Sequence, residues 1–516
     1  AGLMNNVEVV AITHFHPDHF AGLGELLWHY YLEERTEGLE VIGPLGLRER
    51  FRQLIAGWQL SPEKIPFEII LKEVKPGDLI VIYGGRTGID GIHGVTEASM
   101  GFSEKITMGH VQKGDSYLQR KVSELLEEAV ERGLINLSWD LGGGGMSSAI
   151  SETARFTGGA EVHLENTLLK YEGLDLWQMW VSESQERMLA AVSPENINEF
   201  LELARLHDVE VAIMGKYTDS GALHILYKGK AVAYLPLEFL FKKPPQWVFE
   251  AIWIPPETRG LYEPPISDPK DHTAVLKEML RRPNICSKEW ISRQYDHEVK
   301  GGAVIKHMIG EYGDVQGPAV VMAPIHGRKE GVAISQVLNP IQSKIDTFWM
   351  TLNVFDEALR RVTAVAGLRF DQQGNFERVG AVDNFCWPEI RFSKENPDGK
   401  YKAGQLIRSL MALAKVQEEL GVPLLSGKDS MYIDGWVKGK FGEKHRISGL
   451  PCLQITVVSA VDDVRKCQTP DFKFAGDLIY VVGETKNELG ASEFYEMLGY
   501  TGLNIPKADL RERSER

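Results

Sequence analysis

The sequence predicts a protein of mixed α/β and α+β class that contains an internal repeat. Short runs rich in β-branched residues alternate along the chain with helical patterns, and several of the runs lead directly into glycine-rich loops. This alternation is typical of sheets that are covered by helices. The repeat is a strand–loop segment: Gly77-Asp78-Leu79-Ile80 is followed 399 residues later by the similar Gly476-Asp477-Leu478-Ile479.

Composition and charge exclude several functional classes. The 516 residues carry 57 Lys and Arg against 72 Asp and Glu, a net charge of −15, so we expect no nucleic-acid partner. Hydrophobic residues make up 43% of the chain, which is ordinary for a globular protein, but no run of 18 apolar residues occurs, so we expect no membrane span. Four scattered cysteines without a CxxC pair predict a reducing, cytoplasmic location.

Residues 1–75 form one unit by their pattern. The run at 7–12 predicts a buried strand, and 39–43 predicts a second, short strand. Helical patterns follow each of them, at 21–31 and 45–56. We therefore expect a small α/β segment at the start of the chain.

The first of these strands leads into a cluster of metal-ligating side chains within the word HFHPDH. Three imidazoles and a carboxylate on one tight loop are ligand types that zinc prefers. The candidate zinc ligands are His14, His16, Asp18 and His19. The motif resembles the signature of the metallo-β-lactamase superfamily, so residues 1–75 are expected to be a partial αβ segment of that kind. The further downstream ligands of such a site are not found before residue 93.

Residues 76–241 predict strands that end in glycine-rich loops. The strand at 79–83 runs into the loop GGRTGIDGIHG at 84–94. The strand at 135–139 runs into Asp140 and then a row of four glycines. Backbone N–H groups of such loops can bind phosphate, and a carboxylate beside them can bind Mg²⁺.

The same region predicts a helix and a hairpin. An apolar stripe marks the helix at 117–132, which Ser116 or Asp115 can cap and Gly133 can end. Two short strands within 223–235 flank Lys-Gly-Lys, which predicts a β-hairpin.

The second half of the chain divides into three parts. Residues 242–289 are rich in proline and predict an extended linker. Residues 290–470 form another segment of strands and helices, with long helices expected at 346–365 and 403–420. Residues 471–516 hold the second copy of the repeat, and we expect them to form a truncated domain with an uncovered core face and an open sheet edge. We therefore expect poor solubility or self-association.

Longer words in the body of the chain carry a second resemblance. They occur in one order: VQKGD (111–115), WDLGGGGMSSAISE (139–152), SESQERM (182–188), YDHEVKGGAVIK (295–306), DNFCWPEI (383–390), SGKDSMY (426–432) and VVGETKNELGASEFYEMLG (481–499). Together with the loop at 84–94 they resemble the synthetase subunit or domain of phosphoribosylformylglycinamidine synthase, over about residues 74–509.

The resemblance implies a fold of tandem, here incomplete, aminoimidazole-ribonucleotide-synthetase-like units. Each unit has a ferredoxin-like half followed by an α/β half. Residues 76–241 would be the first α/β half, residues 290–470 the second ferredoxin-like half, and residues 471–516 the start of the second α/β half. The first ferredoxin-like half would be absent, with the metallo-β-lactamase-like segment in its place.

The resemblance also implies an activity in purine biosynthesis. ATP phosphorylates the formamide oxygen of formylglycinamide ribonucleotide, and ammonia from glutamine displaces the phosphate to give formylglycinamidine ribonucleotide. ATP and Mg²⁺ would be the cofactors, with zinc as a further candidate at the N-terminal motif. A glutaminase subunit and a small bridging subunit would be the partners.

Site residues follow from the resemblance position by position. Substrate contacts are expected from Gln112, Glu183, Ser184, Gln185 and Ser430. The ATP would border Asp383 and Gly427, and Asp140 would bind Mg²⁺. Many members have a metal-binding Asn where this chain has Lys428, which could meet phosphate directly. The family's catalytic histidine lies in the half that is not found here, so no catalytic residue is assigned.

Other readings of the same residues stay open. Asp140 could cap a helix, Glu183 and Gln185 could begin a solvated helix, and Asp383 could be an ordinary turn residue. At the level of the whole protein, one alternative is a zinc-dependent hydrolase of the metallo-β-lactamase fold. Another is a nucleotide-binding module without catalytic activity.

Overall fold

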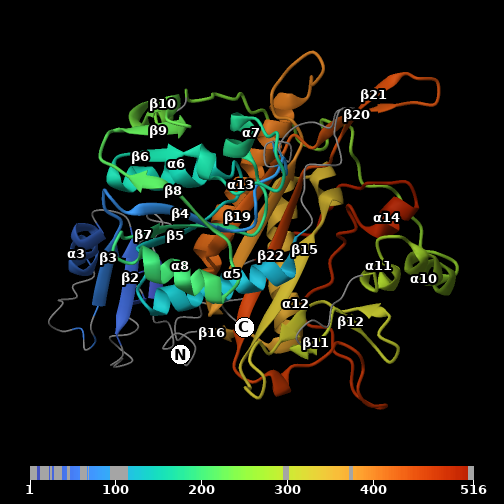
Figure 1. The fold of residues 1–516 in the computed structure, drawn as a ribbon. Coiled ribbons are helices and arrows are strands. Elements are labelled where there is room, and N and C mark those ends of the chain that lie inside the picture. Colours follow the sequence, from blue (N-terminus) through green and yellow to red (C-terminus); the bar gives the residue numbers. More distant parts are fainter. Residues whose placement is uncertain are drawn as a thin grey trace. The chain divides into compact units, whose positions relative to one another are not determined.

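The computed structural model describes most of the chain: residues 9–11, 23, 26–27, 38–43, 47–57, 65, 67, 69–92, 94, 114–243, 245–294, 301–370 and 376–509. The chain divides into two compact units (Figure 1). The first contains residues 1–97 and 106–246, and the second contains residues 98–105 and 247–516. Within the described ranges, no helix is long and apolar enough to cross a membrane.

The first unit begins with a small parallel sheet. Its strands are β1 (Val9–Ala11), β2 (Leu39–Gly43) and β3 (Ile69–Glu73), in that order across the sheet. Helix α3 (Leu47–Gly57) contributes buried side chains to the core that it shares with β2. The strand expected at 39–43 and the helix expected at 45–56 are therefore confirmed to within two residues.

The larger part of the first unit is a seven-stranded sheet in the order β10-β9-β6-β8-β4-β7-β5. Its strands are β4 (Leu79–Gly84), β5 (Leu137–Asp140), β6 (Ala160–His163), β7 (Arg187–Val192), β8 (Val211–Tyr217), β9 (Ala222–Tyr227) and β10 (Lys230–Pro236). The predicted hairpin is confirmed as the antiparallel pair β9–β10. Strand β4 lies inside the sheet and is antiparallel to both of its neighbours, β7 and β8.

Helices cover both faces of this sheet (Figure 1). Ile80 and Ile82 of β4 point into the core that contains helix α6 (Met146–Thr157), while Val81 and Tyr83 point into the core that contains helices α5 (Ser116–Glu131) and α8 (Ile197–Leu206). This alternation follows from the two-residue period of a strand. The helices of this part are α5 (Ser116–Glu131), α6, η3 (Leu164–Asn166), α7 (Leu176–Val181), α8 (Ile197–Leu206) and α9 (Leu237–Leu240).

The ends of α5 agree with the sequence signals. The carboxylate of Asp115 accepts hydrogen bonds from the backbone N–H groups of Tyr117 and Leu118, both at 3.1 Å. Gly133 follows the helix with a φ of +68°, a conformation that glycine adopts without strain. The prediction that Asp115 or Ser116 begins the helix and Gly133 ends it is confirmed, with Asp115 as the cap.

The proline-rich region contains more structure than a simple connector. Residues 245–271 form no helix or strand, but α10 (His272–Arg281) and α11 (Glu289–Ser292) follow. Arg282, just after α10, forms ion pairs with Glu493 and Glu496 of α14 (Glu493–Met497). Proline therefore limits regular structure at the start of this region only, because a ten-residue stretch without proline forms α10.

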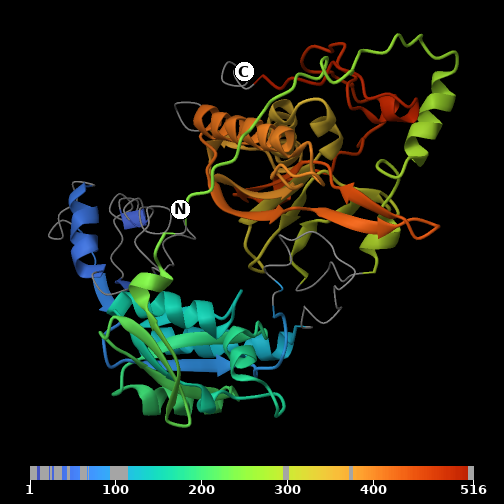
Figure 2. The ribbon, with the colours of Figure 1, turned by 90° about the horizontal axis from the view of Figure 1, so that it is seen from above.

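The second unit is built on a six-stranded sheet in the order β11-β14-β15-β22-β18-β19. Its strands are β11 (Ala303–Ile305), β14 (Val320–Met322), β15 (Gly331–Leu338), β18 (Val379–Trp387), β19 (Leu424–Met431) and β22 (Cys452–Val461). Helices α12 (Thr347–Ala366) and α13 (Gly399–Leu420) pack on one face of it and supply much of its core (Figure 2). These two helices confirm the long helices that the sequence predicts.

Short elements complete the second unit. They are the two-stranded pairs β12 (Met308–Ile309) with β13 (Val315–Gln316), β16 (Arg369–Phe370) with β17 (Phe376–Glu377) and β20 (Asp434–Lys438) with β21 (Lys444–Ser448), and the short helices η5 (Pro340–Lys344) and η6 (Val464–Lys466).

The second copy of the repeat departs from the sequence expectation. A strand like β4 is expected from Leu478 onward, but the described residues 467–492 contain neither a strand nor a helix. The prediction of a strand here is therefore wrong for this structure. The physical reason is that a strand needs hydrogen-bonded neighbours, and no described segment pairs with these residues.

Candidate functional site

Three loops of the first unit meet at one edge of its sheet. β4 ends at Gly84, β5 ends at Asp140, and β7 begins at Arg187. Gly84 pairs with Arg187, and Asp140 pairs with Met188, because β7 lies between β4 and β5. The glycine-rich loops after β4 and β5 therefore lie on either side of the loop before β7, which is the word SESQER.

Glycines allow these loops to approach one another closely. A Cβ atom on Gly84 would overlap the carbonyl oxygen of Glu186, and one on Gly145 would overlap the carbonyl oxygen of Ser182. Both glycines have a positive φ, +107° and +55°. Only glycine fits at these two positions, for steric and conformational reasons together.

A buried arginine joins two of the three loops, the loop before β7 and the loop after β4. The guanidinium of Arg187 donates hydrogen bonds to the carbonyl oxygens of Ser182 (2.6 Å) and Ser184 (2.7 Å) and to Oγ1 of Thr87 (2.9 Å). Desolvation by burial lowers the pKa of Arg187 to about 10, although the nearby Asp90 carboxylate acts in the opposite direction. The side chain is 3% exposed, so it fixes loop positions and does not present its charge to a ligand.

Asp90 and Ser184 form the second half of this network. The Ser184 hydroxyl donates to Asp90 and accepts from the backbone N–H of Gly88, and Lys170 donates to Asp90 at 2.7 Å. Burial raises the pKa of Asp90, but the hydrogen bonds from Lys170 and Ser184 and the charges of Lys170 and Arg187 outweigh it, so the pKa is lowered overall. Ser184 is fully buried within these contacts.

The neighbouring predicted residues are more open. Glu183 accepts a hydrogen bond from the backbone N–H of Gly144 at 3.0 Å, which links SESQER to the glycine row. Gln185 is exposed, and its amide donates to the carbonyl oxygen of Glu183 at 2.8 Å. The structure thus brings together Glu183, Ser184, Gln185 and Asp140 at one edge, with different degrees of burial.

Asp140 has a second carboxylate near it. Its side chain lies over Gly142 and makes no hydrogen bond or ion pair with the described residues. Glu152 of α6 has a raised pKa, mainly because of burial and also because of the charge of Asp140. The Asp140 carboxylate, beside a glycine-rich loop, provides the kind of oxygen ligand that Mg²⁺ prefers.

The second unit places its predicted residues on adjacent strands. Asp383 of β18 is directly opposite Gly427 of β19, and a Cβ atom on Gly427 would overlap the Asp383 carboxylate. Burial raises the pKa of Asp383, and the charge of Asp429 acts in the same direction. The Asp383 carboxylate therefore lies directly against the Gly427 backbone at the edge of this sheet.

Ser430 lies on the other face of the same sheet. Because strand residues alternate, Ser430 and Lys428 share a face with Asn384 and Cys386, opposite to the face of Asp383. Lys428 donates a hydrogen bond to the Ser430 hydroxyl at 2.5 Å. The structure therefore separates Ser430 from the predicted ATP-bordering residues by the thickness of the sheet.

Five predicted residues are outside the part of the chain that the structure describes. They are His14, His16, Asp18, His19 and Gln112. Among the described residues, no group of three or more His, Cys, Asp or Glu side chains could hold a metal ion. Because all four candidate zinc ligands lie outside the described residues, the structure does not test the zinc prediction.

Sequence reasoning did not assign Asp90, Lys170, Arg187 or Glu152. Asp90, Glu152 and Arg187 lie inside the motifs at 84–94, 139–152 and 182–188, but the partner of Asp90, Lys170, is 80 residues away in the sequence. The available signal was an arginine placed directly before the apolar run at 188–192, because an arginine that enters a buried strand needs carbonyl or carboxylate partners.

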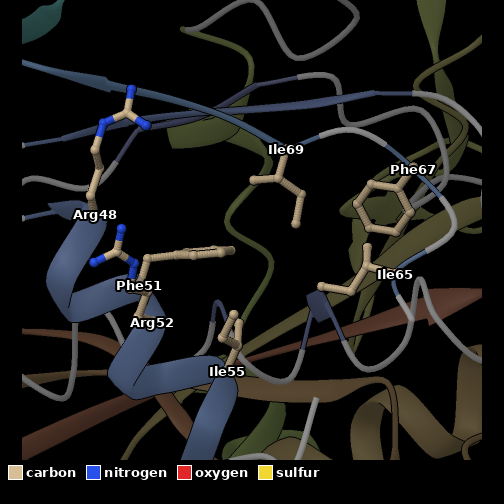
Figure 3. Close-up of a pocket in the computed structure, with 7 residues that line it drawn as sticks. All are labelled: Arg48, Phe51, Arg52, Ile55, Ile65, Phe67 and Ile69. Atoms are coloured by element: carbon tan, nitrogen blue, oxygen red, sulfur yellow. The ribbon is translucent and has the colours of Figure 1, made fainter. Parts of the chain in front are cut away.

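A cavity in the first unit lies apart from these residues. It has a volume of about 250 Å³ and is lined by Arg48, Phe51, Arg52, Ile55, Ile65, Phe67 and Ile69. Figure 3 shows the two arginines along α3 and the apolar side chains around the cavity. It contains none of the predicted site residues.

Comparisons with known proteins agree with the resemblance seen in the sequence. Residues 75–228 match the model of the AIR synthase related protein, C-terminal domain. The phosphoribosylformylglycinamidine synthase subunit PurL of Ignicoccus hospitalis is 34% identical over 431 residues, covering 81% of this chain and 55% of that protein. The chain spans about half the length of the curated relatives it matches.

Solved structures show the same relationship. A Thermotoga maritima PurL complexed with FGAR matches with a TM-score of 0.56 and 27% identity, over 77% of this chain and 57% of that one. A structure of PurLQS from Thermotoga maritima matches in fold with a TM-score of 0.53 and 24% identity, over 78% of this chain and 56% of that one. These matches confirm the predicted fold class.

The comparisons do not support the resemblance of residues 1–75 to the metallo-β-lactamase superfamily, which stays a prediction. Over most of its length, the chain is similar to about half of the PurL subunit of phosphoribosylformylglycinamidine synthase.

Proposed function

We propose that this chain carries part of the active site of a phosphoribosylformylglycinamidine synthase, an ATP-dependent C–N ligase. The observation that carries the proposal is the junction of three loops at one sheet edge, where Asp140, Glu183 and Gln185 are collected beside a glycine-rich turn. This junction belongs to the region that matches the AIR synthase related C-terminal domain. The matched relatives named PurL supply the reaction class.

In this proposal, formylglycinamide ribonucleotide is the substrate, and Glu183 and Gln185 contact it. Ser184 acts by position, since its buried hydroxyl holds Asp90 and the backbone of Gly88. Gln112 and Ser430 are further proposed substrate contacts, and Asp383 with Gly427 borders ATP. The close approach of the Asp383 carboxylate to Gly427 supports this proposal, because the carboxylate and the Gly427 backbone could then contact the same ATP molecule.

Mg²⁺ fits the residues at the end of β5. The Asp140 side chain lies over Gly142 and has no hydrogen-bond partner among the described residues, so its carboxylate oxygens are open to a divalent cation. Asp140 would hold the ion, with Glu152 as a neighbouring carboxylate. When bound, Mg²⁺ supplies neutralisation of charge on phosphoryl oxygens. The N–H groups of Gly144 and Gly145 already donate to Glu183 and Gly142, so Gly142 and Gly143 are the glycines of this row whose N–H groups would be presented beside the ion.

The domain boundaries and partners are part of the same proposal. Residues 76–241 act as a first C-terminal-type α/β domain, residues 290–470 as a ferredoxin-like domain, and residues 471–516 as the start of a second C-terminal-type domain. A glutaminase subunit and a small bridging subunit supply ammonia. The four cysteines are free thiols, which supports the proposed cytoplasmic location.

The test is ATP turnover that depends on formylglycinamide ribonucleotide, with ammonium chloride as the nitrogen source and Mg²⁺ present. Turnover that Asp140→Asn abolishes and Asp219→Asn preserves would support a working site, because Asp219 is an exposed aspartate of the same unit outside the loop junction. Binding of ATP without turnover would indicate the alternative, a nucleotide-binding module. The absence of both ATP binding and turnover would contradict the proposal.

Zinc binding at the N-terminal motif is a separate proposal. β1 ends at Ala11, just before His14, so the motif follows a strand as the resemblance to the metallo-β-lactamase superfamily implies. Metal analysis of the purified chain tests it, with a His14→Ala, His16→Ala double variant as control. Zinc retained equally by both proteins would contradict binding at this motif, and with it the zinc-hydrolase alternative.

A further inference from the structure

Two of the four cysteines lie directly opposite each other on adjacent strands of the second unit. Cys386 of β18 pairs with Cys452 of β22 in the antiparallel register of these strands. Both strands have a further strand on their other edge, so the sheet holds this register from both sides. Opposite residues of an antiparallel pair have Cα atoms about 4.5 to 5.5 Å apart. A disulfide needs about 4.4 to 6.8 Å, so the backbone already places the two residues within reach of a bond.

The two thiols also share one face of the sheet. Their strand neighbours Phe385 and Leu453 point into the core that α12 and α13 cover, so Cys386 and Cys452 point to the opposite face. Neither cysteine is fully buried. Of the other two cysteines, Cys467 packs against the helix-covered core, and Cys286 lies between α10 and α11. Strand register therefore brings together this pair alone among the four cysteines.

The groups around Cys386 leave its thiol available. It donates a long hydrogen bond to Oδ1 of Asn384 at 3.9 Å, which is a weak contact. On the edge of β18 away from Cys452, the residue opposite Cys386 is Ser430, whose hydroxyl accepts a hydrogen bond from Lys428. Cys452 is therefore the neighbour with which Cys386 can form a covalent bond.

The two thiols differ in reactivity. Burial, and to a smaller extent the charge of Cys386, raise the pKa of Cys452 to about 12. The contribution from Cys386 also reflects how close the two sulfur atoms are. Because the thiolate is the nucleophile, Cys452 is a slow attacking group at neutral pH, and Cys386 is the thiol that reacts first.

We propose that Cys386 and Cys452 form a site of reversible oxidation, at which a low-molecular-weight disulfide converts the two thiols into one cross-strand disulfide. The Cys386 thiolate attacks one sulfur of the small disulfide, whose S–S bond breaks and releases a first small thiol. Cys452 then loses its proton and attacks the Cys386 sulfur, which releases the second small thiol. Two protein thiols are oxidised and one small disulfide is reduced to two thiols, which take up the two protons.

Two features of the sheet favour the second step over a lasting mixed disulfide. The register holds Cys452 beside the Cys386 sulfur, so the attack is intramolecular and has a high effective concentration. In addition, a Cys386 that carries the small thiol has no charge, which removes one of the two causes that raise the pKa of Cys452. The site concerns the chain's own thiols and does not depend on synthetase activity.

Thiol counting after exposure of the full chain to oxidised glutathione tests the proposal. The reduced chain should take up maleimide at four cysteines and the oxidised chain at two. Mass spectrometry of a digest should then find the peptides that contain Cys386 and Cys452 joined, and dithiothreitol should restore all four thiols. Four free thiols after oxidation, a disulfide at another pair, or glutathione that stays on Cys386 would each overturn the proposal.

Serine variants assign the two roles. Cys452→Ser should retain glutathione on Cys386, because no second thiol is present to release it, whereas Cys467→Ser, the matched control, should form the disulfide as the unchanged chain does. A double variant with Cys286→Ser and Cys467→Ser leaves the pair intact and should lose both remaining thiols. A double variant that keeps them, or a Cys467→Ser variant that fails to form the disulfide, would contradict the assignment.

Oxidation in denaturant separates the effect of the register from that of chance. In the unfolded chain, Cys452 is 15 residues from Cys467 and 66 residues from Cys386, so closure of the shorter loop is favoured. We therefore expect the disulfide between Cys386 and Cys452 to dominate in the folded chain and to lose its preference in denaturant. The same preference under both conditions would show that the fold does not select this pair, and would overturn the proposal.

Discussion

Strand β4 and residues 478–482 have related sequences, but β4 is buried and paired on both edges, whereas residues 478–482 are exposed and pair with no described strand. Each follows the same aspartate-stabilised turn and is bounded by glycines with positive φ. Strand β4 has hydrogen-bonded neighbours on both edges and helices on both faces, whereas the second segment has none among the described elements. The turn is therefore a property of the local sequence, while the strand depends on partners that are distant in the sequence.

The largest contrast is expected from a core truncation in each copy. Ile80 is fully buried, whereas its counterpart Ile479 is 75% exposed. Ile80→Ala should lower the free energy of unfolding by about 4 kcal/mol, because it leaves a cavity between packed elements. Ile479→Ala should change it by less than about 0.5 kcal/mol in dilute solution. Denaturant unfolding of both variants measures the difference, and equal losses would show that the second segment is packed as the first is.

A smaller contrast is expected at the glycines that end the two segments. Gly84 and Gly483 share a positive φ, but a Cβ on Gly84 would overlap the Glu186 carbonyl, whereas nothing lies within 4 Å of one on Gly483. Gly84→Ala should destabilise by about 3 kcal/mol, from overlap and strain together. Gly483→Ala should cost about 1 kcal/mol, from backbone strain alone. Thermal unfolding followed by circular dichroism separates these values, and a Gly84→Ala protein as stable as the Gly483→Ala protein would contradict the close approach.

The turn aspartates should differ less. Asp78 is 4% exposed and accepts a hydrogen bond from the side chain of Asn136 at 2.9 Å in addition to the turn. Among the described residues, the exposed Asp477 carboxylate accepts only the hydrogen bond from the backbone N–H of Phe474, at 3.2 Å. Asp78→Ala should therefore destabilise by about 2 kcal/mol and Asp477→Ala by about 0.5 kcal/mol. If unfolding midpoints shift by the same amount in both variants, the buried contact to Asn136 contributes nothing.

Much of the fold could be predicted from the sequence because it depends on local signals. The cap at Asp115, the end at Gly133 and the hairpin β9–β10 each follow from residue types at fixed spacing. The absence of a strand at 478–482 could not be predicted in this way, because the residues of this segment have a high propensity for strands. What decides is the presence of neighbouring strands, and propensity carries no information about them.

The candidate site shows the same division between local and distant information. The resemblance assigned Glu183, Ser184 and Gln185 together, but only the fold shows that Ser184 is buried against Asp90 while Gln185 is exposed. The partners of Asp90 come from about 80 and 94 residues further along the chain. Ser430 and Asp383 are likewise assigned together, yet strand alternation places them on opposite faces.

The smallest effect is expected from the loop that follows β4, where the two copies carry Asp90 and Leu489. The pKa of Asp90 is lowered in the folded protein: its burial would raise it, but Lys170, Ser184 and Arg187 act more strongly in the other direction. A carboxylate with a depressed folded pKa stabilises the protein above its ordinary pKa of about 4 and loses that stabilisation as the pH falls towards the folded value.

Asp90→Asn should therefore destabilise by about 1 kcal/mol at pH 7, with a difference from the unchanged chain that shrinks below about pH 4. Leu489→Asn, at the matching position of the second copy, provides the control, because no carboxylate is removed there. Unfolding measured from pH 7 down to pH 3 checks the slope for both variants. A difference for Asp90→Asn that is independent of pH would mean that the ion pair with Lys170 does not act through charge, and that the loop depends on the hydrogen bonds to Ser184 instead.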